Sequence, residues 1–341
     1  MTVFDEIFRA GASPVYLAPM SGFTDIAFRG LCKEQGASVL VSEFVQSEPL
    51  IRSRERAWRD VAFPPSQRPA GIQIFGAVPE SMAAAAQLLE ARLRPDFIDL
   101  NFGCPARKVV EQNAGASLLR DLPQMERVAR AVVEAVPATP ISAKIRLGWE
   151  AKSIVACEAA RRLEAVGVRV IAVHGRTRAQ NYSGEADWEK IAQVVRAVRV
   201  PVVGNGDIFD ASTALRRFSE SGVAGVMVGR GALGNPWIFA EIRAALAGTK
   251  PPSRPSPQKI FATILRYAEA LVAASRRSFP DDAAAENIRP FLPRFFPFTK
   301  GVPAGKSVRA AMSRCATLGD LRAFCEAEIA RCSKLSFPTD L

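Results

Sequence analysis

Three features of this sequence predict an α/β protein, namely a (β/α)8 TIM barrel followed by a small C-terminal α-helical domain. Eight short apolar runs recur through the first 231 residues, with helical patterns between them. After residue 257 the chain shows helical patterns with no such run between them. Short runs that are apolar throughout are typical of strands buried on both faces of a parallel sheet. Eight of them alternating with helices fit a closed barrel.

The eight predicted strands are rich in β-branched and aromatic residues, and most end in Gly, Asn, Asp or Arg. An open doubly wound sheet is the rival arrangement. No Gly-x-Gly-x-x-Gly turn follows the first run, which weakens a dinucleotide-binding version of that rival. The strands are expected at residues 15–20, 39–44, 71–76, 97–103, 141–148, 170–176, 201–207 and 225–231.

The helices are predicted from Pro79 at a helix start and from apolar residues at i, i+3, i+4 and i+7 in 125–136 and 188–198. Residues 50–68 are interpreted as an insertion or an extended second loop. The Pro- and Ser-rich segment 248–258 is interpreted as a linker. It divides a barrel domain, 1–247, from a helical domain, 248–341.

The positive charge of the chain is concentrated in the predicted helical domain. The net charge is +11, and from Lys250 onward there are 15 Lys and Arg against 8 Asp and Glu. Two aromatic and basic stretches, 276–280 and 288–301, lie in the same region. Such a concentration indicates a polyanionic partner, with RNA or DNA first. A basic surface that merely keeps the protein in solution is the alternative.

The composition argues against several classes of protein. No apolar run reaches the ~18 residues that span a bilayer. Acids and an arginine stand where a signal peptide has its apolar core. The six cysteines are scattered, which argues against a disulfide framework, and the single histidine, His174, argues against a zinc site. We therefore expect a cytoplasmic protein without membrane or metal, and a monomer.

In a (β/α)8 barrel the reacting groups lie at the carboxyl ends of the strands. Every predicted strand of this chain delivers a polar or conformationally special residue to that rim. The candidates are Pro19, Met20, Ser21, Glu43, Gln73, Asn101, Cys104, Lys144, Arg146, His174, Arg176, Asn205, Gly206, Asp207, Gly229 and Arg230.

The last two strand ends predict a phosphate site. Loops after the seventh and eighth strands commonly bind phosphate in this fold. Glycines at 204, 206, 229 and 231 free the backbone to turn its N–H groups inward, and Arg230 adds a positive charge. Each glycine taken alone could simply make a tight turn, but the pair of clusters at these two positions favours phosphate.

Polar side chains on the middle strands have two interpretations each. Lys144 and Arg146 alternate with Ile145, so both are expected on one side of their strand. An inward Lys144 is costly unless it meets an anion or an electron-rich ring, and Gln73 could hydrogen-bond a planar heterocycle. A structural partner is the alternative for both residues, and His174 could likewise be a core histidine with its hydrogen bonds satisfied.

Cys104 follows a strand directly and stands between Gly103 and Pro105. It could be a nucleophile, a general acid or mere packing, and packing is the usual role of an isolated cysteine. Cys32 and Cys157 fall in helical patterns and are interpreted as packing. Cys104 differs because it shares the rim with all the polar candidates.

Six blocks of the sequence are distinctive together and in their order. From the N-terminus onward they are LAPMSGFTDIAFRGLC, IDLNFGCPARKV, AKIRLGW, VHGRTRAQNYSGEADWEKI, VVGNGDI and VMVGRGALGNPWIF. In sequence and order they resemble the tRNA-dihydrouridine synthase family, most of all its bacterial B-type subfamily. TKGVPAGKSVRAAMSRC resembles the helical tail of that family. The resemblance implies FMN in the barrel, NADPH (or NADH) as reductant, and a tail that helps to hold tRNA.

The resemblance also implies roles for the rim residues. Cys104 would donate a proton to C5 of a uracil whose C5–C6 bond is reduced, and Asn101 and Arg176 would contact that substrate. The residues implied to bind the cofactor are Pro19, Met20, Ser21, Gln73, Lys144, His174, Asn205, Gly206, Asp207, Gly229 and Arg230. Two rival functions stay open, namely an FMN-dependent barrel oxidoreductase acting on a small molecule and a tRNA-binding scaffold.

Overall fold

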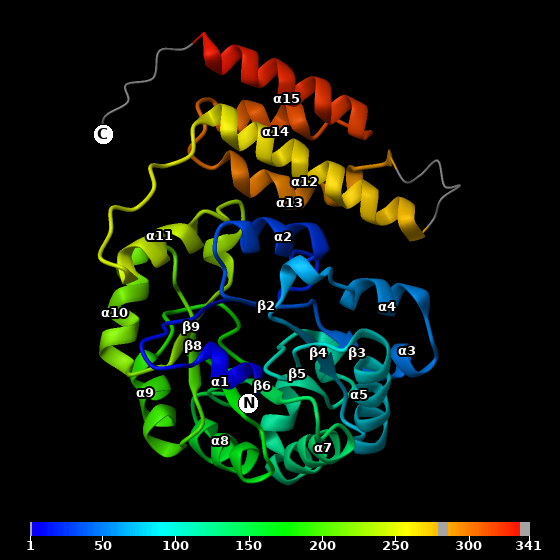
Figure 1. The fold of residues 1–341 in the computed structure, drawn as a ribbon, viewed down its shortest axis with the longest axis vertical. Helices are drawn as coiled ribbons and strands as arrows, with labels where there is room; N and C mark the ends of the chain where they lie inside the picture. The colour runs from blue at the N-terminus through cyan, green and yellow to red at the C-terminus, as the bar shows by residue number, and fades with distance from the viewer. Residues whose placement is uncertain (1, 279–285, 335–341) are drawn as a thin grey trace.

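The chain forms a closed barrel of parallel strands surrounded by helices, and a stack of helices stands beyond it (Figure 1). This computed structural model describes residues 2–278 and 286–334. The strands pair in the order β2-β1-β9-β8-β7-β6-β5-β4-β3, and a β2–β4 pairing closes the barrel. They are β1 Val15–Leu17, β2 Val39–Val41, β3 Val45–Gln46, β4 Ala70–Phe75, β5 Phe97–Phe102, β6 Ile141–Arg146, β7 Val170–His174, β8 Val202–Asn205 and β9 Gly225–Val228.

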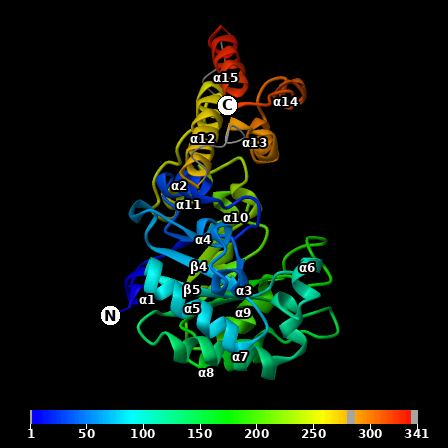
Figure 2. The same cartoon turned by 90° about the vertical axis from the view of Figure 1, so that its right-hand side faces the viewer.

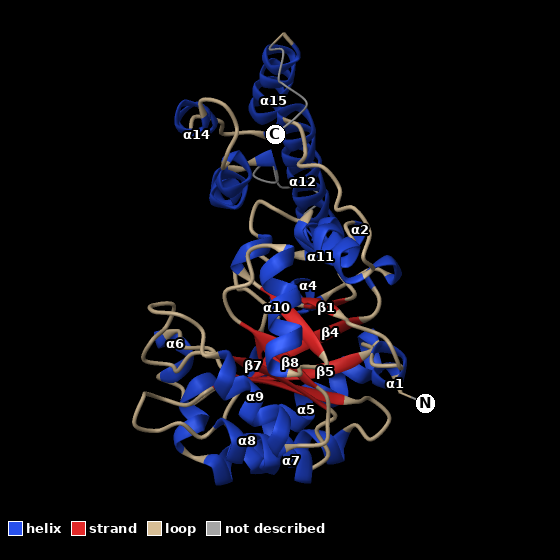
Figure 3. Cartoon of the chain, turned by 90° about the vertical axis from the view of Figure 1, so that its left-hand side faces the viewer, coloured by secondary structure: helices blue, strands red, loops and turns tan. Residues whose placement is uncertain are grey.

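Helices follow the strands and cover the outside of the barrel, so that the strands are enclosed by helices (Figure 3). The predicted barrel is therefore confirmed, as is the helix that starts at Pro79. The helices up to the end of the barrel are α1 Val3–Ile7, α2 Ile26–Glu34, α3 Ser47–Ile51, α4 Glu55–Val61, α5 Pro79–Leu93, α6 Arg107–Val110, α7 Leu122–Ala135, α8 Ala156–Ala165, α9 Trp188–Ala197, α10 Ala211–Ser221 and α11 Ile238–Leu246.

The structure differs from the sequence prediction after the second and fifth strands. The strand β3, which was not predicted, pairs with β4 through Val45 and Ile74, and residues 50–68 hold α4 and a 3-10 turn at Pro65–Gln67. After β5 the chain forms only the four-residue α6 and then a 3-10 helix at Gly115–Arg120. Neither segment has an apolar period long enough to reveal such short elements.

Beyond the barrel the described elements are helices and 3-10 turns, joined by loops and by an isolated bridge between Asn287 and Thr317. The predicted tail helices are confirmed as α12 Pro257–Ser278, α14 Gly305–Met312 and α15 Leu318–Ser333. The stretch 288–301 folds as α13 Leu292–Phe295 between 3-10 turns at Arg289–Phe291 and Phe296–Thr299. Within the other predicted stretch, 276–280, residues 279 and 280 lie outside the described residues. Among residues 2–278 and 286–334, no helix has both the length and the apolar character needed to cross a membrane.

The carboxylate of Asp25 joins the tail to the barrel. Asp25 caps α2 by accepting from the N–H groups of Ala27 and Phe28, both at 2.9 Å. Its other oxygen accepts from Tyr267 Oη on α12 and from Arg294 Nη1 on α13, both at 2.7 Å. Because α2 begins directly after the rim loop that follows β1, this carboxylate ties the tail to one edge of the barrel mouth.

The tail leans toward the same side of the molecule as the carboxyl ends of the strands. Both α6, which follows Cys104, and α14 project to one side in Figures 2 and 3, whereas α1 and the N-terminus lie on the other. A large ligand approaching the mouth of the barrel therefore meets the tail as well.

Candidate active site

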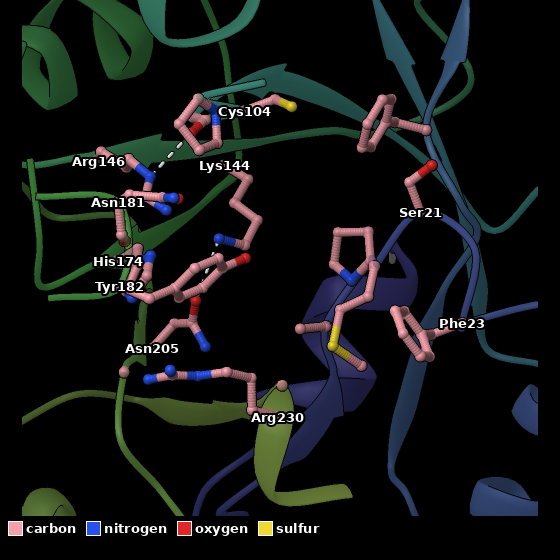
Figure 4. Close-up of a pocket in the computed structure, with 18 of the residues that line it drawn as sticks. Ser21, Phe23, Cys104, Lys144, Arg146, His174, Asn181, Tyr182, Asn205 and Arg230 are labelled. Carbon is pink, nitrogen blue, oxygen red and sulfur yellow. Dashed lines mark hydrogen bonds between the residues drawn. The ribbon is translucent and has the colours of Figure 1, made fainter. Parts of the chain in front are cut away.

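A cavity of about 650 Å³ opens at the carboxyl ends of the strands (Figure 4). Its volume lies within the usual ~300–1,000 Å³ of cofactor and small-molecule sites. The structure brings nearly all of the predicted site residues together in its wall. These are Pro19, Met20, Ser21, Gln73, Asn101, Cys104, Lys144, His174, Asn205, Gly206, Asp207, Gly229 and Arg230.

The loop after β1 is held open toward this cavity. Thr24 fastens it, because its Oγ1 accepts from the N–H of Met20 at 2.9 Å. Glu43, which follows β2, accepts from the N–H of Gly22 at 2.7 Å. The strand therefore ends at Leu17, short of the predicted residue 20, and Pro19, Met20 and Ser21 form one wall of the cavity.

Lys144 on β6 reaches past β7 to Asn205 at the end of β8. Its Nζ donates to Asn205 Oδ1 at 3.1 Å, and Asn205 Nδ2 donates to the carbonyl oxygen of Met227 at 2.7 Å. Burial lowers the pKa of Lys144 to about 8, and the positive charge of Arg146 acts in the same direction. An anionic or electron-rich ligand would favour the ammonium form and remove this cost.

His174 is a neutral imidazole in this wall. Burial, followed by the charges of Lys144, Arg146, Arg176 and Arg230, holds the pKa of His174 well below its usual value. Its ring centroid lies 6.3 Å from that of Tyr182. Because it cannot carry charge near neutral pH, His174 can serve as a hydrogen-bonding group toward a ligand but not as a cation.

Arg176 does not line the cavity, although the family resemblance implies contact with substrate. It is 2% exposed, and its guanidinium donates to both oxygens of Asp207, at 2.9 and 2.6 Å. It also donates to the carbonyl oxygens of Ser183 and Gly184. The donors of this guanidinium are therefore engaged by the loop after β7 and by Asp207. Arg176 positions this part of the wall and presents no group to a ligand.

Asp207 lines the cavity and holds two arginine side chains in place. Besides Arg176 it accepts from Arg230 Nη2 at 2.8 Å and from the N–H of Ala186 at 2.8 Å. The guanidinium carbon of Arg230 also lies 4.7 Å from the ring centroid of Tyr182 and 5.6 Å from that of Phe209. Asp207 therefore holds Arg230 at the rim, and an anion would be bound by Arg230 and not by the carboxylate.

The glycines of the predicted phosphate loops have different roles. Gly206 has a φ of +136°, and a Cβ there would lie 2.5 Å from the Cβ of Ala186. This position therefore excludes a side chain and leaves the backbone open to the cavity. Gly204 is needed for packing, because its Cβ would lie 2.3 Å from the ring of Trp188.

Cys104 sits in a tightly held turn at the mouth of the cavity. Asn101 Oδ1 accepts from the N–H groups of Gly103 at 3.1 Å and of Cys104 at 2.8 Å. Arg146 Nε donates to the carbonyl oxygen of Gly103 at 3.0 Å. Burial raises the pKa of the Cys104 thiol, opposed by the Ala106 N–H and then by Arg146 and Lys144. The thiol is therefore protonated at neutral pH and can donate a proton.

Sequence reasoning did not select several residues of the wall. Asn181 and Tyr182 come from the loop after β7, and Phe23, Phe44 and Phe209 add aromatic surface from three other loops. Arg146, a predicted rim residue, also lies in the wall, where it is buried and its Nη1 donates to two carbonyl oxygens of the β7 loop. Loop residues carry no periodic pattern, so position after a strand was the only available signal.

Comparison with known proteins agrees with this geometry. The family model "Dihydrouridine synthase (Dus)" matches residues 16–333. The chain is 44% identical over 266 residues to a "Probable tRNA-dihydrouridine synthase" of Rhodobacter capsulatus, covering 76% of this chain and 80% of the relative. It is 37% identical over 320 residues to a protein of the same description from Mycobacterium tuberculosis, covering 91% and 80%.

Solved structures of other enzymes share the fold. One is described as "Crystal structure of TcOYE with pHBA", with a TM-score of 0.52 and 11% identity over 72% of this chain and 91% of that one. Another is a 2-naphthoyl-CoA reductase complex, with a TM-score of 0.53 and 10% identity over 69% and 50%. These likenesses show the barrel alone, whereas the family match extends through the barrel into the tail. The rim residues and the match over most of the chain lead to one conclusion, that this chain is an oxidoreductase belonging to the dihydrouridine synthase family.

Proposed function

We propose that this chain is a tRNA-dihydrouridine synthase that reduces the C5–C6 bond of specific uridines in tRNA to 5,6-dihydrouridine. FMN would be its cofactor and NADPH (or NADH) its reductant. One observation carries the proposal, namely the Cys104 thiol in a turn held by Asn101 at the mouth of a cavity lined by cations. Relatives at 37–44% identity are described as probable tRNA-dihydrouridine synthases, which supports the choice of substrate.

The chemistry of the cavity fits FMN. Arg230 and the side-chain-free backbone at Gly206 and Gly229 suit a phosphate, and Asn205 and Asp207 would hold these groups in place. Lys144, Gln73 and His174 offer polar atoms to the ring of the flavin, and Pro19, Met20 and Ser21 offer a flat, largely apolar wall. The cations lining the cavity outnumber Asp207, its one described acidic residue, so an anionic cofactor is favoured.

When bound, FMN would supply the hydride that adds to C6 of the uracil, and the nicotinamide would keep the flavin reduced. The negative charge that develops at C5 and O4 of the base then requires a proton. The Cys104 thiol would donate that proton to C5, leaving a thiolate that takes a proton back from solvent. Asn101 would orient the turn and the base, while Lys144 and Arg146 stabilise the thiolate by their positive charge.

The substrate must present one base to the cavity, which costs a few kcal/mol of unstacking and less where the base is already unpaired. We propose that the barrel, residues 1–247, carries the chemistry and that the helical domain, residues 248–341, grips tRNA through phosphate contacts. We also place the protein in the cytoplasm and expect it to act as a monomer.

The proposal is tested by incubating the purified protein with NADPH and tRNA from a strain that lacks dihydrouridine. We expect a yellow protein whose tRNA product gains dihydrouridine at defined positions, detected by mass spectrometry of nuclease digests. A colourless protein that binds tRNA would favour the scaffold function. A yellow protein that reduces small enones but leaves tRNA unchanged would favour the small-molecule reductase.

Exposed cations of the tail should contribute to tRNA affinity. Changing Arg289, Lys300, Lys306 and Arg314, all exposed, to Gln is expected to weaken tRNA binding at least tenfold, about 1.4 kcal/mol. The dependence of affinity on salt should become shallower, because fewer counterions are released. Fluorescence anisotropy with labelled tRNA at two salt concentrations measures both quantities.

The matched control removes the same number of positive charges from the side of the barrel that faces away from the tail (Figure 1). Arg127, Arg130, Arg161 and Arg196 are exposed on α7, α8 and α9 and are changed to Gln together. This variant should keep nearly all of the tRNA affinity. Equal losses in the two variants would mean that net charge, and not the tail surface, governs binding.

A further inference from the structure

A continuous chain of hydrogen bonds runs through the barrel interior to the turn that carries Cys104. Asp99 Oδ2 accepts from Gln73 Nε2 at 2.5 Å, and Gln73 Oε1 accepts from Asn101 Nδ2 at 2.8 Å. Asn101 Oδ1 then accepts from the N–H groups of Gly103 and Cys104. The three side chains are 3%, 0% and 5% exposed, so water does not compete for these bonds.

The two ends of this series of hydrogen bonds fix the direction in which each amide points. Backbone N–H groups only donate, so the oxygen of the Asn101 amide must face Gly103 and Cys104. Its nitrogen then faces Gln73, whose oxygen must point toward Asn101 and whose nitrogen must point away from it. This last nitrogen requires an acceptor, and Asp99 Oδ2 supplies it. Each amide has one orientation as long as both ends are present.

We propose that Asp99 is a positioning residue that sets the orientation of the Gln73 amide and, through Asn101, holds the turn that presents Cys104. Without an acceptor at position 99, a Gln73 amide in the same orientation would leave a buried N–H without a partner. The amide could rotate to avoid this, but its nitrogen would then face the nitrogen of Asn101, and the hold on Cys104 would weaken.

Both carboxylate oxygens of Asp99 have donors, because the second one accepts from Ser142 Oγ at 2.5 Å. Burial raises the pKa of the Asp99 carboxyl, and the hydrogen bonds from Ser142 and Gln73, followed by the ammonium charge of Lys144, oppose this shift. The same arrangement has a consequence for the cavity wall, because the second N–H of Gln73 and of Asn101 is not used in the chain. A pyrimidine or flavin carbonyl oxygen could accept from either.

The test measures hydrogen exchange at the backbone amides of Gly103 and Cys104 in the full-length purified protein, by mass spectrometry of peptides that span 97–106. Asp99→Leu should speed exchange of these two amides about tenfold, while the amides of α7 keep their protection. Asp99→Asn is the matched variant, because its Oδ1 can still accept from Gln73 while its Nδ2 donates to Ser142. It should exchange within threefold of the wild type.

Ser142→Ala removes the other hydrogen bond to Asp99 and should leave exchange at Gly103 and Cys104 unchanged. If Asp99→Leu does not fold, Gln73→Met interrupts the series of hydrogen bonds at its middle residue. It should speed hydrogen exchange at the same two amides. Unchanged exchange in a folded Asp99→Leu or Gln73→Met protein would overturn the inference. Equal acceleration in Asp99→Asn and Asp99→Leu would assign the effect to charge and overturn it as well.

The consequence for catalysis rests on the proposed function, but the exchange measurement does not. Slower dihydrouridine formation in Asp99→Leu, with NADPH consumption unchanged and near-normal rates in Asp99→Asn, would link the turn to proton donation. Faster exchange in a protein that forms no dihydrouridine from any tRNA would support the positioning role and contradict the proposed function alone.

Discussion

Replacing Cys104 by alanine is expected to lower dihydrouridine formation in tRNA by about 10²–10⁴-fold, the usual contribution of a general acid. In the proposed function the thiol is needed only for protonation of C5, so NADPH consumption with oxygen as acceptor should continue at nearly the wild-type rate. Binding of tRNA should hardly change, because one small side chain is lost from an interface dominated by phosphate contacts. Single-turnover assays of tRNA, alongside NADPH absorbance, separate these quantities.

Cys157→Ala is the control for this variant. Cys157 is a free cysteine of intermediate exposure on α8, outside the cavity, and its loss should leave all three measurements near wild type. A Cys104→Ala enzyme that forms dihydrouridine at the wild-type rate would show that the thiol is not the proton donor. A parallel loss of NADPH consumption would instead indicate a role in cofactor binding.

Replacing Arg230 by alanine is expected to weaken FMN binding by about 10–100-fold. A charge-assisted hydrogen bond to phosphate contributes roughly 1.5–3 kcal/mol, and the loss of Arg230 also leaves Asp207 with one arginine fewer. The protein should still fold, because the side chain of Arg230 is 38% exposed and lies at the rim. Fluorescence titration of the cofactor-free protein with FMN gives the affinity, and circular dichroism reports the fold.

The matched control for Arg230→Ala is Arg216→Ala. Arg216 is an exposed arginine on α10, 4.0 Å from Glu220, and contributes nothing to the cavity wall. It should leave FMN affinity unchanged. If Arg230→Ala binds FMN as tightly as Arg216→Ala does, the phosphate must be held elsewhere, and the interpretation of the loops after β8 and β9 would fail.

The barrel and most of the polar residues at its rim were predictable from local patterns in the sequence. Strands buried on both faces are rich in apolar residues, so runs such as 97–103 and 141–148 are visible without any structure even though they carry single polar residues. A barrel then directs all of its strand ends to one mouth. For this reason Lys144, Asn205 and Cys104, far apart in the chain, could be placed in one site before their contacts were known.

The contacts of each rim side chain, by contrast, follow from the folded arrangement of the loops. Arg176 and Arg230 follow strands in the same way, yet Arg176 is buried against Asp207 while Arg230 lines the cavity. Tyr182 joins the wall from a loop with no periodic signal. These outcomes depend on which loop covers which neighbour, and such contacts are made between segments that a local pattern does not relate.

The hydrogen-bond chain behind Cys104 and the docking of the tail have the same origin. Asp99, Gln73 and Asn101 meet because β4 and β5 are paired in a register that sets Gln73 opposite Asp99. Asp25 meets Tyr267 and Arg294 across more than 240 residues of chain. Sequence periodicity reports which face of an element is buried. The partner that a buried polar group finds there is set by strand register and by the packing of distant elements, which only the folded chain determines.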